Sequence, residues 1–376
     1  MDDKLKKIIY IVLGAFVFLF LFLFIISSCS NRKYSFKDLE LQIVNKSKSY
    51  YKYHESELPS INTVLTISLS DLTNKGIIDD INKLVGNDSN CSGYLTIENN
   101  NNYYMYSPQI TCVNTSETYE SKNLLNVLLE SIVTSGNGLY SIGNSYYFRG
   151  DTVNNYIIFD GLLWRIVKIN NDNSIKLIEA GMREPVVWDD RYNSEMSSTT
   201  GINNYIHDNI NSRIKDTLEA IYNNTYVKKD IMTDDAKGYI KETSLCIGKR
   251  SLKDDINDGS IECSETIDNQ YIGLLQLNEY IIASLDNNCI NADSSACSNY
   301  NYLADFDNSY WTLTGNSENN SQVYKIYNTV TSSLASNSGM ARMVINISEN
   351  TNINGKGTID EPYVVSGMSD EIRKIG

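Results

Sequence analysis

Two stretches of the chain combine aromatic side chains with polar ones. Aromatic rings can stack on flat polar ligands, while carboxylates, amides and guanidinium groups can hydrogen-bond to them. On loops carried by a rigid scaffold, such residues predict recognition of a ligand such as a glycan. The same composition would also arise, without any ligand, from codon bias toward Asn and Tyr. The candidate ligand residues in the two stretches, 188–193 and 305–311, are Trp188, Asp190, Arg191, Tyr192, Asn193, Asp305, Asp307, Tyr310 and Trp311.

The sequence offers little for catalysis or metal binding. It has no Gly-x-Ser-x-Gly elbow, no His-Glu-x-x-His and no Walker A loop. His54 and His207 are its only histidines, and it has no Cys-x-x-Cys pair, which disfavours zinc. Asp305 and Asp307 could bind calcium through oxygen ligands, but a solvated acidic loop is the favoured interpretation. We therefore predict no catalytic residue, metal or cofactor, with calcium as the alternative.

Composition and charge narrow the class of protein. Hydrophobic residues make up 41% and charged residues 21% of the 376 residues, as in a globular chain with room for two or three domains. The net charge of −14 and the pI near 4.7 argue against nucleic acid as a partner, because phosphates would repel such a surface.

The amino-terminal region predicts delivery across a membrane. Residues 8–26 carry no charge and follow Lys4, Lys6 and Lys7. As a helix, this segment would reach about 28 Å, close to the thickness of a bilayer's hydrocarbon core. We therefore expect a single transmembrane helix with residues 30–376 outside the cell. A cleaved signal peptide is one alternative, and a lipoprotein with Cys29 lipidated after a lipobox-like Ile-Ser-Ser-Cys is another.

Six cysteines remain when Cys29 is set aside, and their spacing predicts disulfides. The expected pairs, each short in sequence, are Cys91–Cys112, Cys246–Cys263 and Cys289–Cys297. The first would close a hairpin around an Asn-rich turn at 99–102. For the last four cysteines other connectivities stay open. Paired cysteines favour an extracellular location.

We expect the chain to divide into three parts: a membrane anchor or signal or lipoprotein segment at 1–30, a small region at 31–135 and a larger domain at 136–376. The middle part is expected to hold a helix over 34–57, a strand over 61–69, the disulfide hairpin and a helix over 117–133. The last part is expected to form strands around Trp164, which we predict to be core, and helices over 203–222 and 277–285.

The order of features in residues 8–115 resembles the type IV pilin-like surface proteins of Gram-positive bacteria. An apolar segment runs into an amphipathic helix, followed by Leu72-Thr-Asn-Lys-Gly76 and then Cys91-Ser-Gly-Tyr with the closing Cys112. The chain lacks a Gly-Phe cleavage site and the Glu at the fifth position after one. The resemblance therefore implies the architecture rather than assembly into a pilus.

Residues 138–366 resemble the DUF6273 family of bacterial surface proteins. The ordered motifs include Leu163-Trp-Arg-Ile, Trp188-Asp-Asp-Arg-Tyr-Asn193, Tyr310-Trp-Thr-Leu-Thr314 and Gly339-Met-Ala-Arg-Met-Val. The last of these departs from the family's Gly-Val-Arg-Pro-Val but keeps Arg342, which joins the candidate ligand residues. The resemblance implies a fold similar to C-type lectin-like and formylglycine-generating-enzyme-like domains.

The predicted fold class is α+β: a transmembrane helix, a small pilin-like domain with an α/β-hairpin, and a larger mixed domain. The chain is predicted to be a bacterial cell-surface protein that spans the membrane once. Its extracellular, adhesion-type module would bind a glycan, a host protein or a cell-wall ligand. The alternatives are a surface-associated modifying enzyme related to formylglycine formation, which would need a reactive cysteine pair or a metal, and a structural pilin-like subunit.

Overall fold

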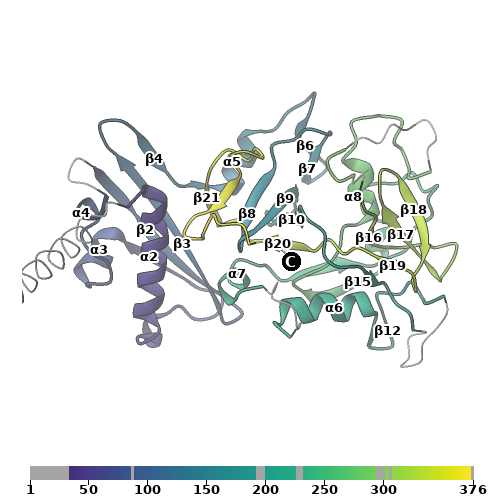
Figure 1. Cartoon of the computed structure of the whole chain (residues 1–376), viewed down its shortest axis with the longest axis horizontal. Coiled ribbons are helices and arrows are strands. Elements are labelled where there is room, and N and C mark those ends of the chain that lie inside the picture. The colour runs from purple at the N-terminus through teal and green to yellow at the C-terminus, as the bar shows by residue number, and fades with distance from the viewer. Residues whose placement is uncertain are drawn as a thin grey trace, which may run out of the picture.

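A computed structural model describes residues 34–85, 89–191, 200–225, 232–293, 297, 301–304 and 307–373. The described chain is mixed α+β. A small sheet with one long helix occupies one end of the molecule, a large curled sheet lies in the middle, and a three-stranded sheet with α8 (Leu277–Ile282) occupies the other end (Figure 1).

The first core forms between helix α2 (Phe36–Tyr51) and a four-stranded antiparallel sheet. The helix begins at Ser35, whose Oγ accepts a hydrogen bond from the Asp38 amide at 3.1 Å. Its buried face, with Leu39 and Ile43, packs on the sheet, and each such side chain contributes about 1.5–3 kcal/mol. The strands, in sheet order, are β1 (Val64–Ser68), β2 (Asn90–Asn100), β3 (Tyr103–Val113) and β4 (Thr118–Glu120), with η1 (Glu55–Glu57), α3 (Leu69–Asn74) and α4 (Ile81–Val85) beside them.

Strands β2 and β3 form the expected disulfide hairpin. Cys91 and Cys112 are opposite each other in its register and are bonded. Asn101 and Asn102 make the turn with φ of 50° and 70°, a conformation that Asn adopts more readily than most residues. The other two bridges are Cys246–Cys263 and Cys289–Cys297, which are the remaining pairs expected from the sequence.

The large sheet has nine strands and branches at β9. Along its main path the order is β20-β10-β9-β8-β22-β21-β5, while β7 pairs with β9 and β6 with β7. All pairs are antiparallel except β22 with β8. The strands are β5 (Lys122–Asn123), β6 (Gly138–Ile142), β7 (Ser145–Arg149), β8 (Tyr156–Phe159), β9 (Leu162–Ile169), β10 (Ile175–Glu179), β20 (Val344–Ile347), β21 (Asn352–Asn354) and β22 (Tyr363–Val365).

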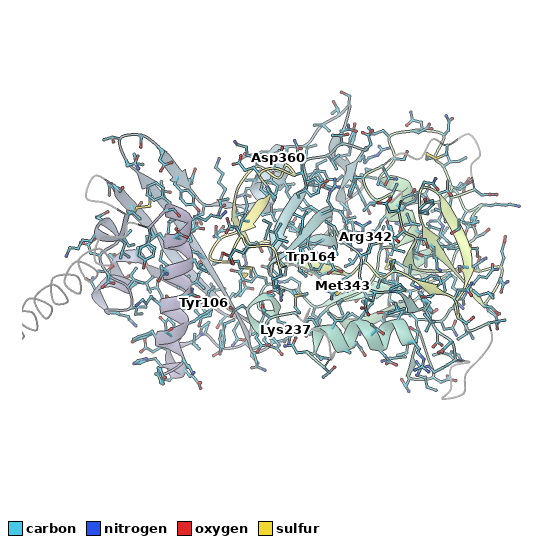
Figure 2. All side chains as sticks on the ribbon, viewed as in Figure 1. Tyr106, Trp164, Lys237, Arg342, Met343 and Asp360 are labelled. Atoms are coloured by element: carbon cyan, nitrogen blue, oxygen red, sulfur yellow. A yellow bond between two sulfur atoms is a disulfide. The ribbon has the colours of Figure 1, made fainter. Side chains whose placement is uncertain are left out.

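The second core is built on this sheet, and Trp164 lies at its centre (Figure 2). Its side chain is fully buried, and the indole nitrogen donates to the Phe159 carbonyl at 3.1 Å. The expectation that Trp164 is core is confirmed. Leu124 and Leu128 of α5 (Leu124–Glu130) also pack in this larger core, although they precede the expected boundary at 136.

Shorter elements complete the 136–376 part of the chain. Two further sheets have the orders β14-β15 and β16-β17-β18, and β11 pairs with β19 and β12 with β13. The bounds are β11 (Val186–Val187), β12 (Ile206–His207), β13 (Ile210–Asn211), α6 (Arg213–Tyr222), α7 (Asp234–Lys237), β14 (Thr243–Cys246), η2 (Glu262–Ser264), β15 (Thr266–Gln270), β16 (Tyr310–Gly315), β17 (Gln322–Ile326), β18 (Val330–Leu334) and β19 (Ser338–Gly339).

All four expected helices are shorter than expected, and those over 203–222 and 117–133 lose at least half their length. The helix expected over 203–222 begins only at Arg213, because residues 206–211 form the β12–β13 hairpin. The side-chain amide of Asn203, before this hairpin, donates to the carbonyls of Asn316, Asn319 and Gln322. The helix expected over 117–133 is reduced to α5, because the residues before it pair as β4 with β3 and as β5 with β21. In both cases, strand pairing overrides a helical pattern.

The expected membrane-anchored fold is corrected by the structure. Among the residues described, none forms a helix with both the length and the apolar run needed to cross a bilayer. The segment 8–26 and Cys29 lie outside the described residues. The fold class that began with a transmembrane helix and the single-pass membrane placement are therefore withdrawn. What replaces that fold class is a mixed α+β chain with a curled nine-stranded sheet.

Candidate functional site

The aromatic residues expected to bind ligand are part of the core. Trp188 and Trp311 are fully buried, and their indole nitrogens donate to the carbonyls of Thr312 and Val186 at 3.2 and 2.9 Å. Tyr310 is also fully buried, and its hydroxyl donates to the Leu303 carbonyl at 2.7 Å. These side chains fix neighbouring loops in place and present no stacking surface.

Arg342 is likewise a structural residue. Its guanidinium donates to the Glu179 carbonyl at 2.8 Å and lies 4.7 Å from the ring centroid of Tyr310 (Figure 2 labels Arg342). Its side chain is 4% exposed, so it links strand ends instead of facing a ligand.

The polar residues of the two stretches do not form one site. Asp190 accepts a hydrogen bond from Arg213 at 2.6 Å, and Arg191 pairs with Asp189 and Asp216, both at 3.2 Å. Asp307 is exposed. None of these three lines the pocket described next. Tyr192, Asn193 and Asp305 lie outside the described residues, so the calcium alternative stays a prediction.

A polar pocket of about 630 Å³ opens where the β9–β10 hairpin meets β14 and the beginning of α8. Most of its lining can donate or accept hydrogen bonds. The amides are those of Asn144, Asn170, Asn171, Gln276, Asn278 and Asn346, and the hydroxyls are those of Ser145, Tyr147, Thr243 and Ser244. Two lysines, Lys168 and Lys176, also line it.

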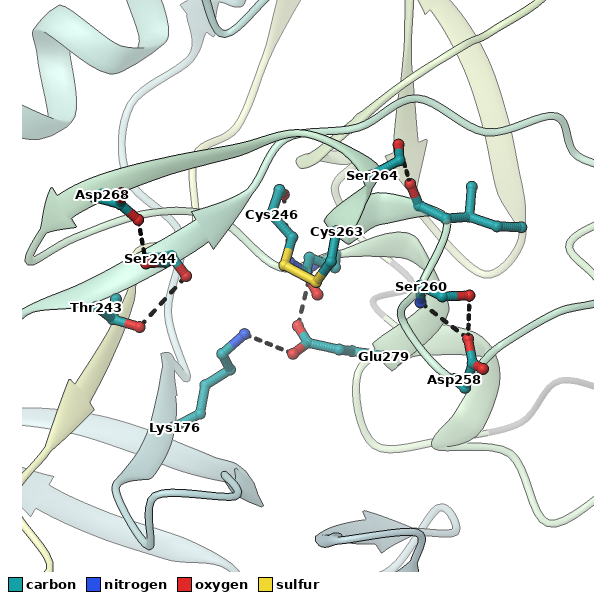
Figure 3. Close-up of a disulfide and its surroundings, with 12 residues drawn as sticks. Lys176, Thr243, Ser244, Cys246, Asp258, Ser260, Cys263, Ser264, Asp268 and Glu279 are labelled. Carbon is teal, nitrogen blue, oxygen red and sulfur yellow. Dashed lines mark hydrogen bonds and ion pairs between the residues drawn. A yellow bond between two sulfur atoms is a disulfide. The ribbon is translucent and has the colours of Figure 1, made fainter.

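The two lysines meet on one buried carboxylate. Lys168 of β9 and Lys176 of β10 are opposite each other in the hairpin register, a placement that would be destabilising for two like charges alone. Their Nζ atoms lie 2.9 and 2.5 Å from the same oxygen, Oε1 of Glu279, whose side chain is fully buried. Lys176 and Glu279 point toward each other beside the Cys246–Cys263 bridge (Figure 3).

Helix α8 orients Glu279 for this role. Its Oε2 accepts a hydrogen bond from the backbone amide of Gln276 at 3.1 Å, as in a capping box at the beginning of the helix. Burial alone would raise the pKa of the Glu279 carboxyl, but Lys176 and Lys168 offset this and hold the pKa at about 2. The carboxylate is therefore charged at neutral pH.

The two lysines differ in their surroundings. Burial lowers the pKa of the Lys176 amine to about 8, with Glu279 opposing the shift and Lys168 adding to it. Burial also acts to lower the pKa of Lys168, but Glu279 and Tyr147 outweigh it, so that pKa is raised. Tyr147 bonds to Lys168, and its ring centroid lies 5.2 Å from the Lys168 Nζ. Lys176 is therefore the more readily deprotonated amine.

A disulfide and a buried ion pair stiffen the far wall of the pocket. Cys246 of β14 and Cys263 of η2 both line it and are bonded. Within the loop that this bridge closes, Arg250 and Glu262 are fully buried and pair at 2.9 Å. Glu262 also accepts from the Asn278 backbone amide at 3.1 Å. The Oδ1 of Asn278 has no hydrogen-bond partner among the residues that the structure describes.

A larger groove of about 940 Å³ lies between β4 and the β21–β22 strands. Its charged lining includes Lys37, which pairs with Asp370 at 2.7 Å, and Lys356, which pairs with Glu361 at 2.8 Å. These are exposed ion pairs, and such pairs contribute little. We consider the polar pocket the better candidate because its charged groups are buried and converge.

Sequence reasoning missed Lys168, Lys176 and Glu279. A signal was present: each of the two strands flanking the turn at 170–174 carries one lysine among apolar residues, and pairing them as a hairpin places the lysines together. Glu279 is distant in sequence and gave no signal. No family model, curated protein or solved structure matches the chain. The two family resemblances therefore stay predictions.

Proposed function

We propose that the chain is an extracellular, adhesion-type protein that binds a glycan in the pocket between the β9–β10 hairpin and β14. The observation that carries this proposal is the lining, in which amides, hydroxyls and lysines surround a cavity of about 630 Å³. Small-molecule sites commonly measure about 300–1,000 Å³ and are mostly apolar. A pocket of that size with a polar lining favours a ligand rich in hydroxyl groups.

The hydrogen-bonding chemistry suits a sugar. Each amide offers both donors and an acceptor, and each sugar hydroxyl needs both. Asn171 at the rim accepts from the Ser145 hydroxyl at 2.6 Å through its Oδ1. We expect its amide nitrogen to donate to the ligand. At the inner end, Asn278 supplies a carbonyl oxygen without a partner among the described residues.

Two further features support the proposal. The pocket is built on paired strands and braced by a disulfide and a buried ion pair, so its polar groups are held in place before a ligand arrives. Three disulfides are typical of proteins that fold outside the cytoplasm, where surface glycans are found.

The experiment is a glycan array probed with the full chain and with two single variants. Asn171→Ala removes an exposed amide that lines the pocket, and Asn82→Ala removes an exposed amide on α4, which packs in the first core. A lost hydrogen bond costs about 1 kcal/mol, so we expect Asn171→Ala to weaken binding about fivefold. Asn82→Ala should bind like the unaltered chain.

Two results would reject the proposal. One is the absence of binding to any glycan on the array. The other is binding that Asn171→Ala and Asn82→Ala leave equally unchanged, because the ligand would then lie outside the pocket.

A further inference from the structure

Around Glu279, two ammonium groups share one carboxylate. Lys168 and Lys176 share a single acceptor atom, Oε1 of Glu279, at 2.9 and 2.5 Å. One carboxylate neutralises only one of the two. The other acidic residues that line the pocket, Asp172 and Asp258, form no ion pair with either lysine among the described residues; they accept hydrogen bonds from Ser174 and Ser260, each at 2.6 Å.

Of the two lysines, Lys176 is the one whose surroundings favour the neutral amine. Lys168 has the Tyr147 side chain as a second partner. For Lys176, Glu279 is the only side-chain partner among the residues that the structure describes. Its side chain is 8% exposed, and burial makes its positive charge costly. A lysine that is desolvated and adjacent to another cation is the usual form of a nucleophilic amine.

We propose that Lys176 is a nucleophilic amine that captures a carbonyl-bearing, hydroxyl-rich ligand as a reversible imine. The inference rests on the proposed glycan-binding pocket and specifies the ligand class further: a sugar in its open-chain aldehyde or keto form. Lys176 lines the cavity, so a ligand held by the surrounding amides places its carbonyl carbon near Nζ.

The covalent step balances without any redox partner. Neutral Lys176 attacks the carbonyl carbon, and a C–N bond forms as one of the two amine hydrogens passes to the carbonyl oxygen. The two hydrogens of the amine leave with that oxygen as water when the C=N bond forms. Lys168 stays charged, keeps its ion pair with Glu279 and can donate a hydrogen bond to the carbonyl oxygen.

The test is reductive trapping on the full chain. Glyceraldehyde, a small hydroxylated aldehyde, is incubated with the protein and cyanoborohydride, which reduces an imine to a stable secondary amine. Peptide mapping then gives the labelling rate of each lysine. We expect Lys176 to be labelled at least tenfold faster than the exposed Lys356. The pKa of Lys176 is lowered from 10.5, and each unit by which it falls increases its neutral fraction about tenfold. The rate at Lys176 should rise with pH to a midpoint near 8.

Variants at Lys168 provide a second test that leaves Lys176 itself unaltered. Lys168→Arg retains the neighbouring cation and should leave the labelling of Lys176 fast. Lys168→Met leaves Lys176 alone with Glu279 and should slow its labelling about tenfold or more, since the pKa then rises. Lys356→Met should change nothing at Lys176.

The inference is wrong if Lys176 is labelled no faster than Lys356, or if Lys168→Met and Lys168→Arg behave alike. Glycans attached to an array through their reducing ends carry no free carbonyl. Binding there without trapping at Lys176 would overturn the imine and leave the proposed glycan binding standing. Trapping without array binding would support the imine and reject the broader proposal.

Discussion

The Lys176 ammonium nitrogen lies 2.5 Å from Oε1 of Glu279, and the two residues belong to different elements, strand β10 and helix α8. This contact joins the large sheet to α8, whose Asn278 bonds in turn to Glu262 beside the Cys246–Cys263 bridge. The Glu279 side chain is fully buried, so the carboxylate stays charged only because the two lysines lie beside it. The stability of this region and the electrostatics of the pocket are therefore linked.

Replacing Glu279 tests that link. Glu279→Gln leaves two ammonium groups buried without a counter-charge and should lower the free energy of unfolding by about 3–5 kcal/mol. Urea unfolding at pH 7 measures it. Glu361→Gln breaks the exposed pair with Lys356 and should cost less than about 1 kcal/mol. Equal, small effects of both substitutions would show that the buried network carries little stability.

The buried Glu40, which lies where the two cores meet, should make the stability of the fold depend on pH. Its buried carboxyl on α2 faces uncharged groups, Ser121, Tyr119, Ser366 and Asn354, and the last two come from the 136–376 part of the chain. Burial raises its pKa to about 7 from the ordinary value of 4.5. The folded state therefore binds the proton more tightly, so stability is full below pH 4.5 and is lost as pH rises through 7.

The expected loss from Glu40 is about 3 kcal/mol between pH 4.5 and 8, from about 1.4 kcal/mol for each unit of pKa. Glu40→Gln keeps the shape of the side chain and removes the titration, so its stability should fall less over this range. Urea unfolding at several pH values compares the two. A variant with the same pH slope as the unaltered chain would contradict this assignment.

The bridges at Cys246–Cys263 and Cys91–Cys112 should have separable effects. They span 17 and 21 residues, so removing either pair by Cys→Ser substitution should destabilise the chain by about 3 kcal/mol in the chain-entropy model. Only the Cys246–Cys263 pair lines the pocket, so only its removal should weaken glycan binding. Thermal unfolding and binding assays on both double variants decide this. Binding weakened equally by both would place the site elsewhere.

Trp164 should be essential to the second core. Trp164→Ala removes a fully buried indole from the large sheet and should cost about 3–5 kcal/mol. Trp164→Phe keeps an aromatic ring and loses the hydrogen bond to the Phe159 carbonyl, so it should cost less. Denaturant unfolding measures both. If the alanine variant is stable and has lost only ligand binding, Trp164 belongs to the site.

The parts of the fold that could be predicted from the sequence depend on local pattern. The Cys91–Cys112 hairpin follows from alternating apolar residues around an Asn turn, and the burial of Trp164 follows from strand spacing. The helix over 203–222 could not be predicted correctly, because its first half forms the β12–β13 hairpin, and the contacts that hold Asn203 before it come from residues beyond 315.

The site was harder to predict for a related reason. Trp188 and Trp311 look like ligand residues because polar groups flank them, but burial by distant strands decides their role. Lys168 and Lys176 can be paired by hairpin register, whereas the carboxylate between them comes from α8, about 100 residues later in the chain. Convergence of distant segments is what sequence pattern alone does not reveal.

The central claim is that the pocket between the β9–β10 hairpin and β14 holds the ligand. Hydrogen–deuterium exchange of the full chain, with and without its best-binding glycan, tests it most directly. We predict slower exchange with ligand at 142–147, 168–172 and 243–246, the segments that line the pocket. Slower exchange confined to Asp190, Arg191 and Asp307, with these segments unchanged, would contradict the account.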